Sequence, residues 1–167
     1  YQPACCIVTG IDLDHMEFLG PDRESIGREK AGIFHPGIPA ICGDPQPPQS
    51  LVAHAAQIGA SLQIMGRDFG FQRQEQQWLY WGRAAGGSGQ ETTAGVKRRG
   101  GLAFPALRGE KQLANAACAL AAARVMGVEP DVAIRGMHEV TSPAGRYAVA
   151  TFGEGAKAVQ GRLMLSK

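Results

Sequence analysis

The sequence predicts an α/β protein of layered architecture with a mainly parallel sheet. Two observations support this prediction. Short apolar segments alternate with segments of helical periodicity, and most of these segments end at glycine or proline. The chain has 167 residues, of which 44% are hydrophobic and 19% are charged, so it is long enough to bury a core of ordinary size.

The first half of the chain alternates strand and helix. Residues 4–9 (ACCIVT) form an apolar run that stops at Gly10, as is typical of a short buried strand. Pro21 then opens a helical pattern with acidic residues first and basic residues later, an order that complements the helix dipole. We therefore predict strands at 4–9, 39–42 and 61–65, and helices at 21–34 and 49–58.

The second half begins with a different pattern of residues. Aromatic and polar residues alternate between Phe69 and Trp81, which predicts a β-hairpin. Residues 82–101 contain seven glycines and few apolar residues, so we expect a flexible surface loop there. The remaining pattern predicts an extended segment at 102–107, helices at 111–126 and 130–140, and a last strand at 147–152.

Composition excludes several classes of protein. The formal net charge of +2 argues against a dedicated nucleic-acid-binding protein, which is usually strongly basic. The longest apolar runs are far shorter than the ~20 residues that span a bilayer, and the first residues lack the pattern of a signal peptide. The four cysteines include no C-x-x-C pair, so we expect reduced, buried side chains. These features predict a cytoplasmic protein that binds neither nucleic acid nor membranes.

Carboxylates and an imidazole gather directly after the first predicted strand. Asp12, Asp14, His15 and Glu17 lie where the chain leaves the carboxyl end of this strand, and open α/β sheets bind their ligands at that edge. Oxygen ligands with a single imidazole suit Mg²⁺ or Mn²⁺ better than zinc. The spacing by itself leaves both a metal site and a solvated polar loop open.

A lysine near the end of the first predicted helix is a second candidate. In the segment 28–33 (REKAGI), a partly neutral Lys30 amine can act as a nucleophile or take up CO₂ and become an anionic metal ligand. An exposed salt bridge is the simpler interpretation of the same residues, and the local sequence favours it.

A third candidate lies where the long Ala-rich helix begins. Gly109 precedes this helix, and Gln112 and Asn115 place two amide side chains in its first turns. Helix N-termini favour phosphate groups, although ordinary helix capping explains the pattern as well.

Other polar residues give weaker signals. Arg146, which follows a turn at 142–145, is a candidate for contact with phosphate. Three further histidines have no partners at metal-ligand spacing and are expected to be structural or solvent-facing: His35, His54 and His138. The sequence contains no G-x-x-x-x-G-K-[ST], H-E-x-x-H or G-x-S-x-G motif, so any nucleotide chemistry lacks its usual phosphate loop.

Four segments together carry a family resemblance. They are 11–20 (IDLDHMEFLG), 26–37 (IGREKAGIFHPG), 39–50 (PAICGDPQPPQS) and 107–117 (LRGEKQLANAA). In this order they resemble the motifs of the folylpolyglutamate synthase/dihydrofolate synthase family, relatives of the Mur peptide ligases, and the third is similar to its bifunctional bacterial form. The resemblance covers residues 4–147. It implies part of a three-layer, mainly parallel P-loop-NTPase-like central domain of a Mur-type ligase, with a small β-hairpin insertion.

The resemblance also implies a reaction and the residues that serve it. The family uses ATP to phosphorylate a dihydropteroate or folate carboxylate, and the amine of glutamate then displaces phosphate from the acyl phosphate. His15 is implied as a Mg²⁺ ligand, Lys30 as a carbamylated residue that bridges metal ions, and Gln112, Asn115 and Arg146 as contacts of ATP. The expected partners are these small molecules alone, with Mg²⁺ as cofactor and a monomeric protein.

The sequence departs from the family pattern at three places. Lys111 stands where the family usually has His, and the turn at 143–146 (PAGR) has one residue more than the usual Pro-Gly-Arg. Residues 156–167 are not similar to the start of the family's C-terminal domain. We therefore expect 1–147 to be the latter part of the central ATPase domain without its phosphate loop and upstream glutamate ligand. Residues 148–167 are expected to be a divergent tail, with the C-terminal ligase domain absent.

These features favour an ATP-dependent carboxylate–amine ligase of folate biosynthesis, present as an incomplete chain that is inactive by itself. Two alternatives are a non-catalytic truncated fragment and a Mur-type peptidoglycan ligase. The second ranks lower because the His-x-x-x-Leu-Gly spacing from His15 to Gly20 is usually lacking in the equivalent loop of those ligases.

Overall fold

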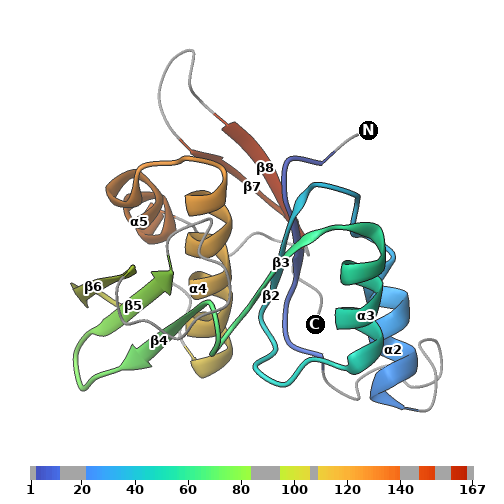
Figure 1. The fold of residues 1–167 in the computed structure, drawn as a ribbon. Coiled ribbons are helices and arrows are strands. Elements are labelled where there is room, and N and C mark those ends of the chain that lie inside the picture. The colour runs from blue at the N-terminus through green and yellow to red at the C-terminus, as the bar shows by residue number, and fades with distance from the viewer. Residues whose placement is uncertain are drawn as a thin grey trace.

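Strands and helices alternate through the first half of the chain, and a second sheet follows in the second half (Figure 1). The computed structural model describes residues 3–11, 22–83, 95–105, 109–139, 147–152 and 159–164. Their elements are β1 (Cys6–Val8), α2 (Arg23–Ala31), β2 (Pro39–Cys42), α3 (Gln49–Ile58), β3 (Ser61–Ile64), β4 (Phe69–Arg73), β5 (Trp78–Arg83), β6 (Val96–Leu102), α4 (Glu110–Val125), α5 (Pro130–Glu139), β7 (Tyr147–Phe152) and β8 (Val159–Met164).

The first three strands form a parallel sheet in the order β1-β2-β3. Ala40 of β2 pairs with Cys6 of β1 on one side and with Leu62 of β3 on the other. Because the strands are parallel, all three end at the same edge, which we call the carboxyl edge. Ligands of open α/β sheets bind at this edge.

Helices cover both faces of this sheet. On one face, Ile26 of α2 and Leu51 of α3 are fully buried against Ala40 and Cys42 of β2. On the other face, Ile41 belongs to the core that α4 builds. Since neighbouring residues of a strand point to opposite faces, β2 joins the two cores, and the three-layer α/β prediction is confirmed.

The helix α4 approaches the sheet closely because alanines form most of its buried surface. A Cβ atom added to Gly43, which follows β2, would lie 2.6 Å from the Sγ atom of Cys118 and 3.4 Å from the Cα atom of Thr9. The middle of α4 therefore touches the backbone where β1 and β2 end. Figure 1 shows the N-terminal end of α4 on the side toward which β3 runs.

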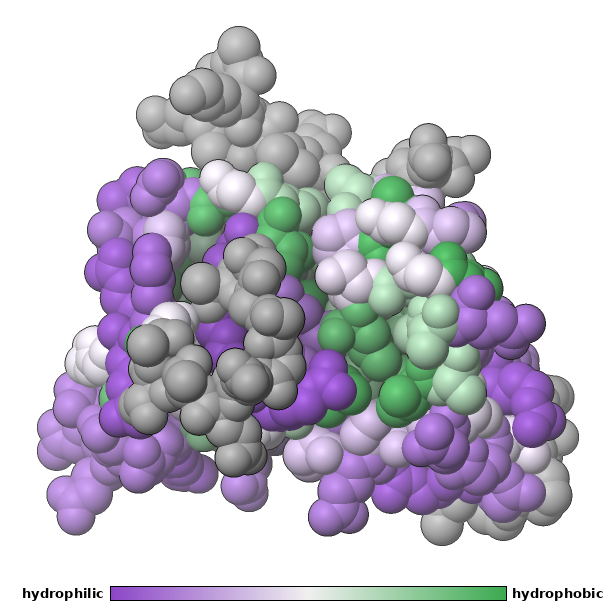
Figure 2. All heavy atoms as spheres, in the orientation of Figure 1, coloured by the Kyte–Doolittle hydropathy of each residue, from purple (hydrophilic) through white to green (hydrophobic). Residues whose placement is uncertain are grey.

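An antiparallel sheet in the order β4-β5-β6 packs against α4 as well. Phe69 and Trp78 are completely buried there, and the indole Nε1 of Trp78 donates a hydrogen bond of 2.9 Å to the carbonyl oxygen of Ala103. Figure 2 shows hydrophobic atoms gathered between the two halves of the protein, over β2 and β3, whereas polar atoms cover the outer parts of this face.

The structure confirms most predicted elements and corrects three. The first predicted helix ends at Ala31 instead of 34, because the N–H groups of Gly32 and Ile33 turn back to the carbonyl oxygens of Glu29 and Lys30, three residues earlier. Part of the expected 82–101 loop is the strand β6, so the hairpin is a three-stranded sheet. The strand at 147–152 is not the last one, since it pairs with β8.

Candidate functional site

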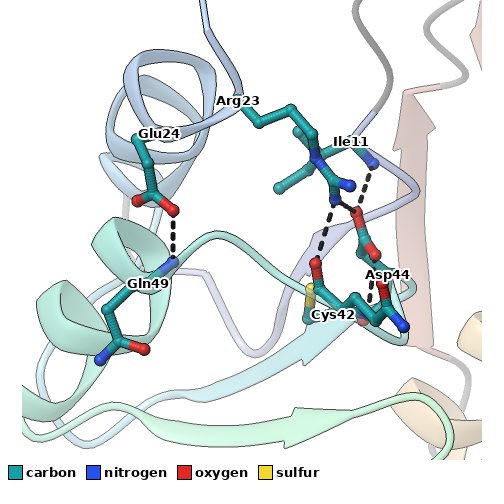
Figure 3. Close-up of polar contacts among 7 residues, drawn as sticks. Ile11, Arg23, Glu24, Cys42, Asp44 and Gln49 are labelled. Atoms are coloured by element: carbon teal, nitrogen blue, oxygen red, sulfur yellow. Dashed lines mark hydrogen bonds and ion pairs between the residues drawn. The ribbon is translucent and has the colours of Figure 1, made fainter.

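Asp44 forms the best-defined polar centre at the carboxyl edge. It lies two residues after β2 and is 7% exposed. Its Oδ2 atom accepts hydrogen bonds from the backbone N–H of Ile11 at 3.2 Å and from the Nη2 atom of Arg23 at 2.6 Å. Its Oδ1 atom accepts from the N–H of Gln46 at 2.9 Å. Figure 3 shows these donors converging on one carboxylate.

Arg23 compensates the buried charge of Asp44. The same Nη2 atom also donates to the carbonyl oxygen of Gln46 at 3.0 Å, so the guanidinium is fixed at two points of the turn after β2. The Arg23 side chain is 42% exposed and that of Asp44 is 9% exposed, which places the pair at the boundary between core and solvent. The hydrogen bonds to both oxygens of Asp44 and the cation beside it offset the cost of burying this side chain.

Two further carboxylates hold helix N-termini at this edge. Asp22 accepts a hydrogen bond from the N–H of Ser25 at 2.8 Å, and this bond lowers the pKa of Asp22. Glu24 accepts from the N–H groups of Ser50 at 2.7 Å and Gln49 at 3.0 Å, and these bonds lower the pKa of Glu24. Figure 3 shows the contact with Gln49. Because Pro48 gives α3 no side-chain cap, α2 supplies the cap of its neighbour.

Gln112 and Asn115 lie together in the first turns of α4. The Nδ2 atom of Asn115 donates to the Oε1 atom of Gln112 at 3.4 Å, and both residues are half-buried. Gly109 makes no side-chain cap and has φ of 125°, a conformation that favours glycine. Ordinary helix capping, the alternative that the sequence left open, therefore does not involve these two amides. They remain a pair of hydrogen-bond donors and acceptors on one face of α4.

Lys30 lies in the last turn of α2 and is half-buried. None of the ion pairs in the described part of the chain includes it, so the salt bridge that the local sequence favoured is not found there. Since α2 and α4 pack on opposite faces of the sheet, Lys30 is separated from Gln112 and Asn115 by the sheet itself. A ligand shared by these residues would have to extend over an edge of the sheet.

Two predicted site residues, His15 and Arg146, lie outside the described residues, as do Asp12, Asp14 and Glu17. Within the ranges that the structure describes, no group of three His, Cys, Asp or Glu side chains could hold a metal ion. The three other histidines agree with their expected role: His35 and His138 are exposed and His54 is half-buried.

The cysteines are free thiols, as expected. Cys6, Cys42 and Cys118 are buried and Cys5 is half-buried. Burial raises the pKa of Cys5 and of Cys118 to about 12 and that of Cys42 to about 11. Because the thiolate is the reactive form, these side chains do not act as nucleophiles near neutral pH.

Sequence reasoning missed Arg23 and Asp44. The available signal was an acidic residue directly after a buried strand, at the edge where ligands bind. Taken with the α4 residues, the carboxyl edge offers charged anchors on one face of the sheet and an amide pair on the other. This arrangement can hold an anionic ligand against α4, and it can fix the acidic segment that leaves β1.

Comparisons with known proteins identify a similar arrangement. No family model matches the chain. Dihydrofolate synthase/folylpolyglutamate synthase of Escherichia coli strain K12 is 47% identical over 74 residues, which are 44% of this chain and 18% of that protein. The solved E. coli enzyme with DHPP and ADP has a TM-score of 0.67 at 36% identity, covering 86% of this chain and 31% of that one. The Yersinia pestis bifunctional enzyme, complexed with AMPPNP and Mn ion, has a TM-score of 0.67 at 38% identity, covering 87% and 32%.

The fold and the arrangement of the sheets place the chain in the class of Mur-type ligases. Within that class, its sequence and fold are similar to those of the dihydrofolate synthase/folylpolyglutamate synthase family. The chain spans about a third of the length of the solved relatives that it matches. No helix in the described part of the chain is long and apolar enough to cross a membrane.

Proposed function

We propose that residues 1–147 are the latter part of the central ATPase domain of a ligase that joins L-glutamate to dihydropteroate or folate. One observation carries the proposal: the linked amides Gln112 and Asn115 lie in the first turns of α4, and α4 packs on the parallel sheet of a fold similar to that of the E. coli enzyme. ATP transfers its terminal phosphoryl group to the substrate carboxylate. The glutamate amine then attacks the acyl carbon, the amide bond forms and phosphate leaves.

The proposed nucleotide contacts are Gln112, Asn115 and Arg146. The positive end of the α4 dipole favours an anionic group beside its first turn. An amide pair supplies both a donor and an acceptor to a nucleotide, and the cation of Arg146 would pair with phosphate oxygens. The half-buried position of Gln112 and Asn115 supports this role, because it leaves their side chains accessible to a ligand.

The proposed cation is Mg²⁺, held by His15 and by a carbamylated Lys30. The donor chemistry fits, since Asp12, Asp14 and Glu17 surround His15 in sequence with the oxygen ligands that such a cation prefers. When bound, the cation offsets negative charge on the transferring phosphoryl group. Lys30 is half-buried and takes part in none of the ion pairs in the described part of the chain, so none of these pairs occupies the amine that would react with CO₂.

Binding of ATP tests the nucleotide part of the proposal. The wild-type chain and the Gln112→Ala/Asn115→Ala variant would be titrated with ATP in the presence of Mn²⁺. We expect about five- to thirtyfold weaker binding in the variant, because it loses hydrogen bonds worth about 1–2 kcal/mol. Gln57→Ala, an exposed amide on α3, is the matched control and should bind as the wild type does. Equal affinity in all three proteins would refute the assignment.

A chimera tests catalysis. These residues would replace the corresponding segment of the E. coli enzyme, and glutamate-dependent ligation of dihydropteroate would be measured. We expect the chimera to be active and the 167-residue chain by itself to be inactive. The chain matches only 18% of the E. coli enzyme, and positioning of the substrates needs other parts of that enzyme. Turnover by the chain itself would contradict this expectation, and a folded but inactive chimera would favour a non-catalytic chain.

Lys30 can be tested in the same chimera. Lys30→Ala and Lys30→Arg should both lower kcat by at least a hundredfold, because arginine keeps the charge and cannot form the carbamate. Lys97→Ala, on the exposed strand β6, is the control for loss of a lysine and should keep full activity. Activity retained in Lys30→Arg would show that the positive charge suffices, against the carbamate.

A further inference from the structure

We propose that Asp44 is a positioning residue, which holds together the two ends of the segment between β1 and α2. This segment runs from Asp12 to Pro21 and contains His15. The consequence for metal binding rests on the proposed role of His15, whereas the anchoring itself follows from the contacts of Asp44.

A single oxygen atom joins both ends. The Oδ2 atom of Asp44 accepts the N–H of Ile11, the residue before the segment, and the Nη2 of Arg23, the first residue of α2 after it (Figure 3). Ile11 is 33 residues and Arg23 is 21 residues from Asp44 along the chain, so neither hydrogen bond belongs to a local turn. Asp44 therefore fixes the distance between the entry and the exit of the segment.

The anchor itself is rigid. The N–H of Gln46 binds the other carboxylate oxygen, and Arg23 also binds the carbonyl oxygen of Gln46. Ile11 is buried in the core beneath α2 and α3, which holds its backbone in place. Closing both ends of a segment lowers the number of conformations open to its side chains. A carboxylate that already accepts three hydrogen bonds has little capacity left to bind a metal ion, so its role is to position other residues.

Asp44→Asn is the direct test. The asparagine keeps the shape but loses the charge that pairs with Arg23, and one of its two terminal atoms becomes a donor. We expect amide hydrogen exchange in peptides that span residues 9–26 to be at least fivefold faster than in the wild type, with exchange in α4 unchanged. We also expect Mn²⁺, followed by electron paramagnetic resonance, to bind at least fivefold more weakly.

Arg23→Gln is the second variant and protects the test against loss of folding. It removes the charged contact but leaves the hydrogen bonds from Ile11 and Gln46 to Asp44. We expect smaller changes of the same sign. Combined with Asp44→Asn, it should add little, because both substitutions break the same contact.

Asp68 offers a matched control. Its carboxylate accepts the N–H of Ile64 at 2.8 Å and the Nε of Arg67 at 2.9 Å, which is the same chemistry after a different strand of the sheet. Asp68→Asn should leave Mn²⁺ affinity and exchange in residues 9–26 unchanged. If the role of Asp44 were purely structural, Asp44→Asn and Asp68→Asn would lower the free energy of unfolding equally, and neither would change the affinity for Mn²⁺.

The outcomes separate the two proposals. If the wild-type chain binds Mn²⁺ and Asp44→Asn binds it equally well, the positioning role is refuted and the proposed metal site survives. If the wild-type chain binds no Mn²⁺, the proposed metal site fails, and the exchange experiment still decides whether Asp44 anchors the segment. Unchanged exchange in Asp44→Asn refutes the inference whatever the metal result.

Discussion

Substitution of Gly43 by alanine should separate α4 from the end of β2. The added Cβ would lie 2.6 Å from the Sγ of Cys118, well inside the distance that two such atoms can approach. The new Cβ and the sulfur cannot move apart easily, because Cys118 is 2% exposed and the Cα of Thr9, the residue after β1, lies 3.4 Å from the new Cβ. The clash therefore has to be relieved by a shift of α4 or of the backbone after β2.

The expected loss of stability follows from two opposing effects. Overpacking of a core costs about 1–3 kcal/mol. Replacing glycine by alanine reduces the entropy of the unfolded chain and returns about 0.4–1 kcal/mol. We expect Gly43→Ala to lower the free energy of unfolding by about 1–2 kcal/mol, which corresponds to a fall in Tm of roughly 2–8 °C for a protein of this size.

Urea denaturation with the partner substitution tests this explanation. Cys118→Ala removes the clashing sulfur and should cost about 1 kcal/mol by itself, because it leaves a small cavity. In the double variant the new methyl group occupies that space, so the double variant should be at least 1 kcal/mol more stable than the sum of the single losses predicts. Gly10→Ala is the control, because nothing lies within 4 Å of its added Cβ. Strict additivity of Gly43→Ala and Cys118→Ala would refute the reasoning.

Two further predictions concern titratable groups. Hydrogen bonds from the N–H groups of Ser50 and Gln49 hold the pKa of Glu24 below its ordinary value of 4.5, so its contribution to stability is complete above about pH 5 and is lost as the pH falls through the folded-state pKa. Glu24→Gln should flatten the acid side of a plot of Tm against pH, and an unchanged acid limb would contradict this role. The raised pKa values of Cys5, Cys42 and Cys118 predict that iodoacetamide at pH 8 labels the folded chain far more slowly than the urea-unfolded chain, as mass spectrometry would measure; equal rates would show that these thiols are not protected.

The sequence was sufficient where local pattern decides structure. The strand at 39–42 and the helix at 49–58 were predicted at their observed bounds, and the helix α4 within one residue at each end. In these elements apolar periodicity, a glycine stop and burial all agree. The family motifs also predicted the fold class, because their order along the chain carried the resemblance to Mur-type ligases, and the observed helices and strands follow in the α/β order that this resemblance implies.

The sequence was insufficient where distant residues decide structure. β6 reads as a loop because its exposed residues Lys97, Arg98 and Arg99 and its glycines have little strand propensity, yet pairing with β5 makes it a strand. Asp44 was missed for a related reason. Its burial depends on Ile11 and Arg23, and no local spacing indicates that a carboxylate after a strand will bind both.

The position of Lys30 limits how the family's chemistry can operate in this chain. Lys30 belongs to the layer of α2 and α3, whereas Gln112 and Asn115 belong to α4 on the opposite face. Helical side chains lean toward the N-terminus of their helix, and α2 begins at the carboxyl edge. A side chain in the last turn of α2, such as Lys30, therefore has to extend back along the helix to approach that edge. One site can then include both layers only across that edge. The contacts of Asp44 with Ile11 and Arg23 fix the backbone at this crossing, and a change there should alter metal binding more than an equally severe change elsewhere in the sheet.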